Sequence, residues 1–145
     1  MKFWDSSAIV PLIVADPRTS ALQRLYQRDA AVLVWWATEI ECVSAVARLE
    51  RQQDLTARAA LESFRRLDAL KTSWNEVQPL DGVRRIARRL LRVHSLRAAD
   101  SFQLAAALVA SEGQPGSLEM VSLDDRLVDA GRREGLEVIE VEGGE

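Results

Sequence analysis

The sequence has very little cysteine, histidine and lysine, and each shortage narrows the class of protein. Its 145 residues include one cysteine, Cys42, and one histidine, His94, which excludes an internal disulfide and a zinc site built on cysteines. Of the 19 basic residues only Lys2 and Lys71 are lysine, so any phosphate contact would depend on arginine. With 22 acidic residues and a formal net charge of −3, the chain has no overall positive field to hold a nucleic acid.

Long hydrophobic runs are also missing. The longest apolar runs, residues 30–37 and 104–110, are far shorter than the roughly 20 residues that a membrane-spanning helix needs. Asp5 comes before the apolar segment of a secretion signal could form. We therefore expect a cytoplasmic protein with no part in a membrane. The length, without repeats or linker-like segments, favours one domain over residues 1–145.

Hydrophobic periodicity divides the chain into alternating strands and helices. The apolar run at residues 31–35, rich in β-branched and aromatic residues, is typical of a strand buried on both faces. In the helix that follows, Cys42 and Val46 belong to a stripe that faces the core. The predicted strands are residues 2–5, 31–35, 74–77, 118–123 and 138–141, and the predicted helices are residues 7–14, 18–28, 38–51, 54–70, 81–93, 98–111 and 125–134. This alternation predicts an α/β domain with a mainly parallel sheet.

Four acidic residues stand directly after predicted strands or in the first turns of helices: Asp5, Glu41, Asp100 and Asp124. Each position also has a purely structural explanation. Asp5 and Asp124 suit helix N-caps, and residues 38–41 match a capping box. Asp100 in a first helical turn complements the helix dipole. Two neighbours, Glu39 and Asp125, compete with Glu41 and Asp124 for the same roles.

Taken together, the acids indicate a ligand site. In a parallel sheet the C-terminal ends of all strands lie at one edge, so Asp5, Glu41 and Asp124 converge there. If the strands at residues 2–5 and 118–123 are neighbours, their chains diverge at that edge and open a crevice, the usual ligand site of open α/β sheets. Four carboxylates in one crevice repel each other unless a cation neutralises them, and Mg²⁺ or Mn²⁺ suits such ligands. Such a cation can activate water against a phosphodiester.

Four blocks of the sequence resemble, in the right order, the signature blocks of PIN-domain proteins, and most closely those of the small VapC-type ribonuclease toxins of bacterial toxin–antitoxin pairs. The blocks are Phe3-Trp4-Asp5-Ser6-Ser7-Ala8, Ala37-Thr38-Glu39-Ile40-Glu41-Cys42-Val43-Ser44-Ala45, Leu96-Arg97-Ala98-Ala99-Asp100-Ser101-Phe102-Gln103-Leu104-Ala105 and Val121-Ser122-Leu123-Asp124-Asp125-Arg126-Leu127. The resemblance covers essentially the whole chain, and the block around Asp100 is much more specific than the first.

The resemblance implies a three-layer α/β/α fold with strand order 3-2-1-4-5 and endonuclease activity on RNA that depends on Mg²⁺ or Mn²⁺. It implies that Asp5 and Asp100 are metal ligands and that Glu41, rather than Glu39, holds a metal-bound water. Asp124 is expected to be the fourth acid, in preference to Asp125, because it stands directly after its strand. Ser7 and Ser122 either support these ligands or cap helices, and both possibilities remain open.

The family further implies a homodimer and a small antitoxin that inserts a segment into the acidic crevice. The helices at residues 38–51 and 54–70 are the candidate surfaces for these partners. The alternative is a non-catalytic or differently targeted PIN module, such as an RNA-binding or regulatory subunit.

The helix at residues 81–93 has a basic side that consists of Arg84, Arg85, Arg88, Arg89 and Arg92. A solvated helix face is preferred, with an RNA-backbone strip or a dock for an acidic partner as the alternative. His94 is not needed in a carboxylate site and is expected to be structural. Of Trp35 and Trp36, at least one should be core, while the other could stack a base or line a partner surface.

Overall fold

A parallel sheet organises the chain, and the computed structural model describes residues 1–141. The strands are β1 (Lys2–Trp4), β2 (Val32–Trp35), β3 (Asn75–Val77), β4 (Glu119–Val121) and β5 (Glu137–Ile139). They lie in the order β3-β2-β1-β4-β5, and every neighbouring pair is parallel. β1 and β4 are therefore adjacent, with Phe3 beside Met120 and Trp4 beside Val121. The predicted fold class and strand order are confirmed.

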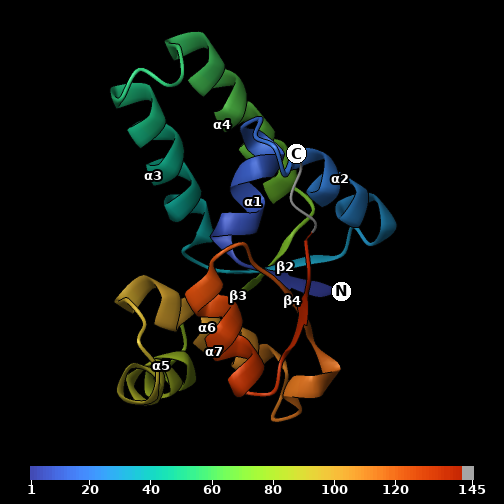
Figure 1. Cartoon of the computed structure of the whole chain (residues 1–145), viewed down its shortest axis with the longest axis vertical. Coiled ribbons are helices and arrows are strands. Elements are labelled where there is room, and N and C mark those ends of the chain that lie inside the picture. Colours follow the sequence, from blue (N-terminus) through green and yellow to red (C-terminus); the bar gives the residue numbers. More distant parts are fainter. Residues whose placement is uncertain (142–145) are drawn as a thin grey trace.

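Helices cover both faces of the sheet, α1 to α4 on one side and α5 to α7 on the other (Figure 1). The helices are α1 (Ser6–Ile13), α2 (Thr19–Arg28), α3 (Thr38–Arg51), α4 (Ala57–Lys71), α5 (Asp81–Val93), α6 (Ala98–Ala110) and α7 (Asp125–Arg133), with a 3₁₀ turn η1 (Pro115–Ser117) before β4. The α3–α4 pair extends beyond the sheet as an arm (Figure 1). None of the helices in residues 1–141 is both long and apolar enough to cross a membrane.

The strands are apolar on both faces because each face has its own core. Phe3 and Trp4, adjacent in β1, are both fully buried but belong to different clusters of packed side chains. Phe3 packs in the cluster that contains Leu90 and Leu104, below α5 and α6, whereas Trp4 packs in the cluster of α1 to α4. Alternate residues of a strand point to opposite faces, so a doubly covered strand needs a continuous apolar run.

Four local predictions are wrong. The helix expected from residue 54 begins at Ala57, because the Thr56 side chain accepts a hydrogen bond from the Ala59 N–H and caps it there. The predicted strands at residues 118–123 and 138–141 are shorter, as β4 and β5. The capping box at residues 38–41 does not form: Ala37 is the N-cap residue of α3, and no side chain caps it.

Gly135 ends α7 with a φ of 93°, which L side chains rarely adopt. We expect Gly135→Ala to lower the free energy of unfolding by about 1 kcal/mol, measured by urea denaturation. Gly82→Ala is the matched control, since an added Cβ there meets nothing within 4 Å and lies in a helix that favours alanine. Equal loss of stability in both variants would show that the backbone at Gly135 is not strained by a side chain.

Candidate active site

Asp5 lies at the point where β1 and β4 separate, and two serines hold its carboxylate. The side chain is 3% exposed. The Ser122 hydroxyl donates to Asp5 Oδ2 over 2.8 Å, and the Ser7 hydroxyl donates to the same oxygen. The Leu123 N–H in turn donates to Ser7 Oγ over 2.9 Å, which ties α1 to the chain after β4. Asp5 occupies the N-cap position of α1 but makes no side-chain cap bond, so the helix-cap explanation for it is wrong.

Asp124 caps α7, so the interpretation of this residue as a helix N-cap is confirmed. Its Oδ1 accepts hydrogen bonds from the backbone N–H groups of Arg126 (2.9 Å) and Leu127 (3.1 Å). Its own N–H donates to Ser122 Oγ over 3.1 Å, so Ser122 joins Asp124 to Asp5. Asp124 can cap α7 and also take part in a site with Asp5, because its Oδ1 alone accepts both cap hydrogen bonds.

Glu41 is held by Gln103, a residue that the sequence analysis did not single out. The Gln103 Nε2 group donates to Glu41 Oε2 and, over 3.0 Å, to Thr38 Oγ1. Gln103 is fully buried, and its Oε1 has no hydrogen-bond partner. The sequence spacing could have indicated this role of Gln103. It follows Asp100 by three residues in α6, which places both on one side of that helix.

Glu39, the competitor of Glu41, is engaged elsewhere. Its Oε1 lies 2.7 Å from Nζ of Lys71 at the end of α4. Asp125, the competitor of Asp124, is exposed in the first turn of α7. The structure thus brings Asp5, Glu41, Asp100 and Asp124 into one neighbourhood and turns Glu39 toward the arm.

Burial, and after it the charges of neighbouring acids, raise the pKa values of Asp5, Glu41 and Asp100. Burial raises the pKa of Glu41 to about 7; the Gln103 hydrogen bond opposes this rise, while the charges of Asp5 and Asp100 add to it. Burial also raises the pKa of Asp5, against the hydrogen bonds from Ser7 and Ser122, with added repulsion from Asp124 and Asp100. The pKa of Asp100 is raised by burial and then by Asp124. Arg97 and Arg126 partly oppose the rise in the pKa of Asp100.

A cavity of about 490 Å³ opens beside the acids. Asp100, Asp124 and Asp125 line it together with Arg97 and Arg126. Asp5 and Glu41 are not among its lining residues, so the four acids form a partly covered group with Asp100 and Asp124 at its open side. Within residues 1–141, no group of three or more acidic, histidine or cysteine side chains meets the spacing of a preformed metal site.

The sequence matches a known protein family over most of its length. The sequence model of the PIN domain matches residues 2–133. The chain belongs to the PIN domain family. Two proteins of Mycobacterium tuberculosis, Ribonuclease VapC45 of strain CDC 1551 / Oshkosh and Ribonuclease VapC49 of strain ATCC 25618 / H37Rv, are each 30% identical to it over 129 residues. The aligned part covers 89% of this chain and 87% of each relative.

Solved structures share the fold of this PIN domain. PAE2754 from Pyrobaculum aerophilum aligns with a TM-score of 0.63 at 19% identity, over 94% of this chain and 87% of that chain. FitAcB from Neisseria gonorrhoeae aligns with a TM-score of 0.65 at 16% identity, over 97% of both chains. The predicted family is therefore confirmed, both in sequence and in fold.

The remaining residues of interest have defined places in the PIN domain. Trp35 is buried and stacks on Phe102, with ring centroids 5.5 Å apart, whereas Trp36 is 51% exposed. His94 pairs with α7: its Nε2 lies 2.8 Å from Glu134 Oε2, and Arg89 donates to both oxygens of the same carboxylate.

Proposed function

We propose that this PIN domain is a metal-dependent endoribonuclease, the toxin component of a type II toxin–antitoxin pair, which hydrolyses RNA phosphodiester bonds by metal-activated water. The observation that supports this most strongly is the burial of Asp5, Glu41 and Asp100 close to one another, with Asp124 beside Asp5 and Asp100, at the C-terminal edge of the sheet. The chain is also similar over most of its length to two proteins named ribonucleases.

The donor set suits Mg²⁺, with Mn²⁺ as its substitute, because all four side chains offer carboxylate oxygens. Asp5, Asp100, Asp124 and Glu41 would hold one or two such ions, and waters and substrate oxygens would complete the ligands. A divalent ion bound there lowers the pKa of water and neutralises charge on the phosphodiester. No side chain is needed as a nucleophile.

The chain's own residues orient the acids. Ser7 and Ser122 occupy Oδ2 of Asp5 and fix its carboxylate plane between β1 and β4. Gln103 occupies Oε2 of Glu41, so Oε1 is the oxygen that accepts a hydrogen bond from the attacking water. Arg97 and Arg126, on the walls of the open cavity, neutralise phosphate oxygens next to the bond that is cut.

The proposed partners are RNA, a small cognate antitoxin and a second copy of the chain in a homodimer. The arm of α3 and α4 is the proposed surface for the protein partners, and Ile40 of α3 and Leu61 of α4 are exposed on it. A cytoplasmic location and a single domain over residues 1–145 remain predictions.

A direct test is cleavage of a labelled RNA by the purified protein with Mg²⁺, with Mn²⁺ and with EDTA. We expect cleavage with either cation, none with EDTA, and products with 5′-phosphate and 3′-hydroxyl ends. Asp100→Asn should reduce the cleavage rate about a hundredfold or more. RNA binding without cleavage under all three conditions would favour a non-catalytic PIN module instead.

Gln103→Leu should lower kcat for RNA about tenfold while KM stays the same. The reason is that Glu41 loses the amide that orients its carboxylate, and a hydrogen bond to a charged group contributes roughly 1.5–3 kcal/mol. Gln23→Leu, the same substitution at an exposed position of α2, should leave both constants unchanged. A rise in KM with unchanged kcat would mean that Gln103 serves binding rather than the orientation of Glu41.

A further inference from the structure

Three cavities with shared lining residues follow one another from the acids. The cavity of about 490 Å³ beside Asp100 shares Asp125 with a second cavity of about 420 Å³. Ser122, which donates to Asp5, also lines this second cavity. The second cavity shares Ile139, Glu140 and Val141 with a third of about 220 Å³. A chain-like ligand could therefore run from the acids, past the end of β5, to α2.

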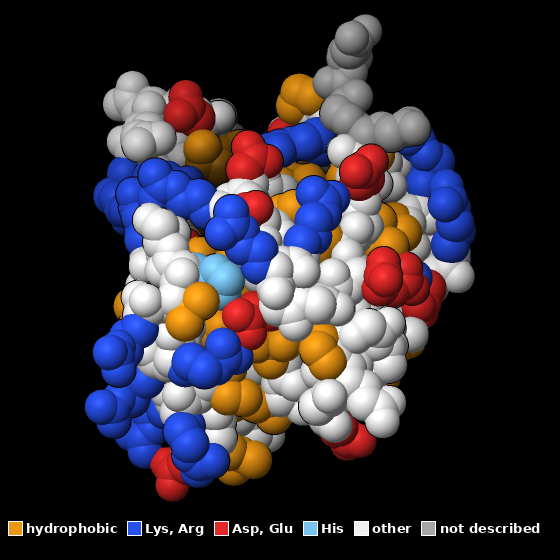
Figure 2. All heavy atoms as spheres, turned by 60° about the horizontal axis from the view of Figure 1, so that its bottom comes forward, with side chains coloured by type: hydrophobic (Ala, Val, Ile, Leu, Met, Phe, Trp, Pro, Cys, Tyr) orange, Lys and Arg blue, Asp and Glu red, His pale blue; other side chains and the backbone are white. Residues whose placement is uncertain are grey.

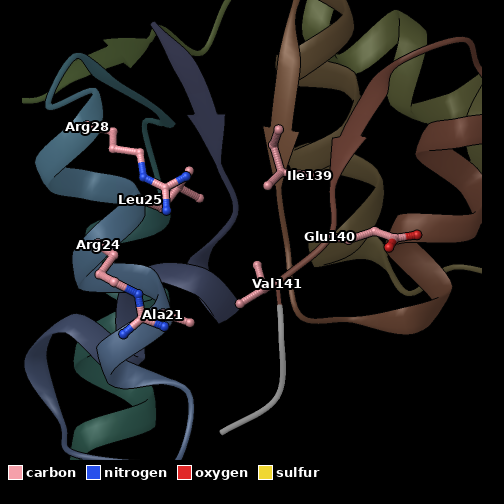
Figure 3. A pocket seen from close by; sticks show the side chains of 7 residues that line it. All are labelled: Ala21, Arg24, Leu25, Arg28, Ile139, Glu140 and Val141. Atoms are coloured by element: carbon pink, nitrogen blue, oxygen red, sulfur yellow. The ribbon is translucent and has the colours of Figure 1, made fainter.

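Arginines line the part of this series that lies away from the acids. Arg18 and Arg132 line the second cavity, and Arg24 and Arg28 line the third. Arg24 and Arg28 are one helical turn apart in α2, and Figure 3 shows both side chains directed toward the space between α2 and the end of β5. We name these four residues the arginine groove.

Among residues 1–141, the carboxylates at the arginine groove are Asp125 and Glu140, which line the second cavity, and Asp16, which lies beside Arg18. In Figure 3 the Glu140 side chain extends away from Arg24 and Arg28. Glu140 instead lies 3.5 Å from Arg132, and it is 87% exposed. Arg18 lies 3.7 Å from Asp16. Exposed ion pairs at these distances contribute little, so Arg18 and Arg132 stay available for another anion.

We propose that the arginine groove binds the phosphate backbone of single-stranded RNA on one side of the cleavage site. This proposal rests on the proposed function and adds to it the path of the substrate. Along this path the charge of the lining residues changes from negative at the acids to positive at the arginines, which suits a nuclease that binds a cation and a phosphate backbone. Carboxylates surround the position of the cation, and arginines neutralise the phosphates farther along the strand. Although the net charge of the chain is −3, this local group of arginines would let it bind RNA.

The basic side of α5 is the other candidate for this role, and it is the weaker one. Figure 2 shows basic side chains on the side of the molecule that carries α5. Arg88, Arg89 and Arg92 line a separate cavity of about 450 Å³. That cavity shares no lining residue with the one beside the acids.

Substrate length tests the groove, because only a long RNA reaches it. We would measure KM and kcat with a 4-nucleotide and a 16-nucleotide RNA for Arg24→Gln/Arg28→Gln and for Arg18→Gln/Arg132→Gln. For the long RNA we expect KM to rise about tenfold in each double variant at constant kcat, because uniform binding is lost. For the short RNA neither constant should change. The slope of log affinity against log salt should fall by about 1.4 for two lost phosphate contacts.

The control removes the same charge elsewhere: Arg88→Gln/Arg92→Gln on the basic side of α5 should behave as wild type with both RNAs. Arg24→Lys/Arg28→Lys should restore most of the affinity, since lysine keeps the charge. The groove is refuted if its variants match the α5 control, or if KM rises equally for both RNAs. Wild-type protein that cuts neither RNA with Mg²⁺ or Mn²⁺ refutes the proposed function itself, and the groove with it.

Discussion

Asp5→Asn is expected to lower the rate of RNA cleavage by about a hundred- to a thousandfold and, in metal-free buffer, to make the protein more stable. The rate falls because a carboxylate that would hold the cation becomes a neutral amide. The stability rises because Asp5 is 3% exposed and close to Asp124 and Asp100, so its charge is costly without a cation. We expect the melting temperature in EDTA to increase by about 3 °C, measured by calorimetry.

Lower activity together with higher metal-free stability distinguishes a residue of the metal site from a structural residue. Asp125→Asn alters an exposed carboxylate beside the same cavity, and it should change the cleavage rate less than about threefold and the melting temperature hardly at all. Added Mn²⁺ should stabilise the wild type and the Asp125 variant but not Asp5→Asn, because binding to the native state alone raises stability. Loss of both activity and metal-free stability in Asp5→Asn would instead indicate that Asp5 is a structural residue.

The strands of the sheet were predictable from sequence because the hydrophobic pattern of each strand is visible in its own residues. Strands covered on both faces need continuous apolar runs, and the run at residues 31–35 shows this without any knowledge of its neighbours. The strand order is not local, and it came from the resemblance of four sequence blocks. Once the order places β1 beside β4, Asp5 and Asp124 must come close together, because Asp5 directly follows β1 and Asp124 stands only three residues after the end of β4.

The hydrogen bonds around the acids could not be predicted in the same way. Thr38 fits a capping box by sequence, yet it is fully buried and accepts a hydrogen bond from Gln103, 65 residues later. Ser7 and Ser122 stand at positions that suit helix caps, yet both donate to Asp5. A local pattern describes which bonds a residue can make, whereas tertiary contacts decide which bonds it does make.

Glu39 and Glu41 illustrate the same limit. Both lie in the first turn of α3, and their spacing gives no preference. The position of α4 decides, because Lys71 at its end reaches Glu39 and leaves Glu41 to Gln103. The sequence block around Glu41 favoured the same assignment, without giving its physical reason.

Glu41 should make the stability of the metal-free protein depend on pH. Its pKa is about 7 in the folded protein and 4.5 as the ordinary value, so the native state keeps a proton that the unfolded state releases. The stabilisation from this proton is complete below pH 4.5 and is lost as the pH rises through 7. The loss is at most about 3 kcal/mol, and closer to 1–2 kcal/mol because solvent screens a half-buried group.

Urea unfolding in EDTA at pH 5, 6, 7 and 8, for the wild type and Glu41→Gln, measures this loss. We expect the wild type to lose stability relative to the variant across this range, because only the wild type must ionise a desolvated carboxyl. Glu134 has the opposite sign, since Arg89 holds its pKa below the ordinary value of 4.5, and a range that starts at pH 5 keeps its contribution constant. Saturating Mn²⁺ should flatten the wild-type curve, because the cation replaces the proton in neutralising the acids. A constant difference between wild type and variant at all four pH values would mean that Glu41 is not desolvated, and the electrostatic argument for the metal site would then lose its main support.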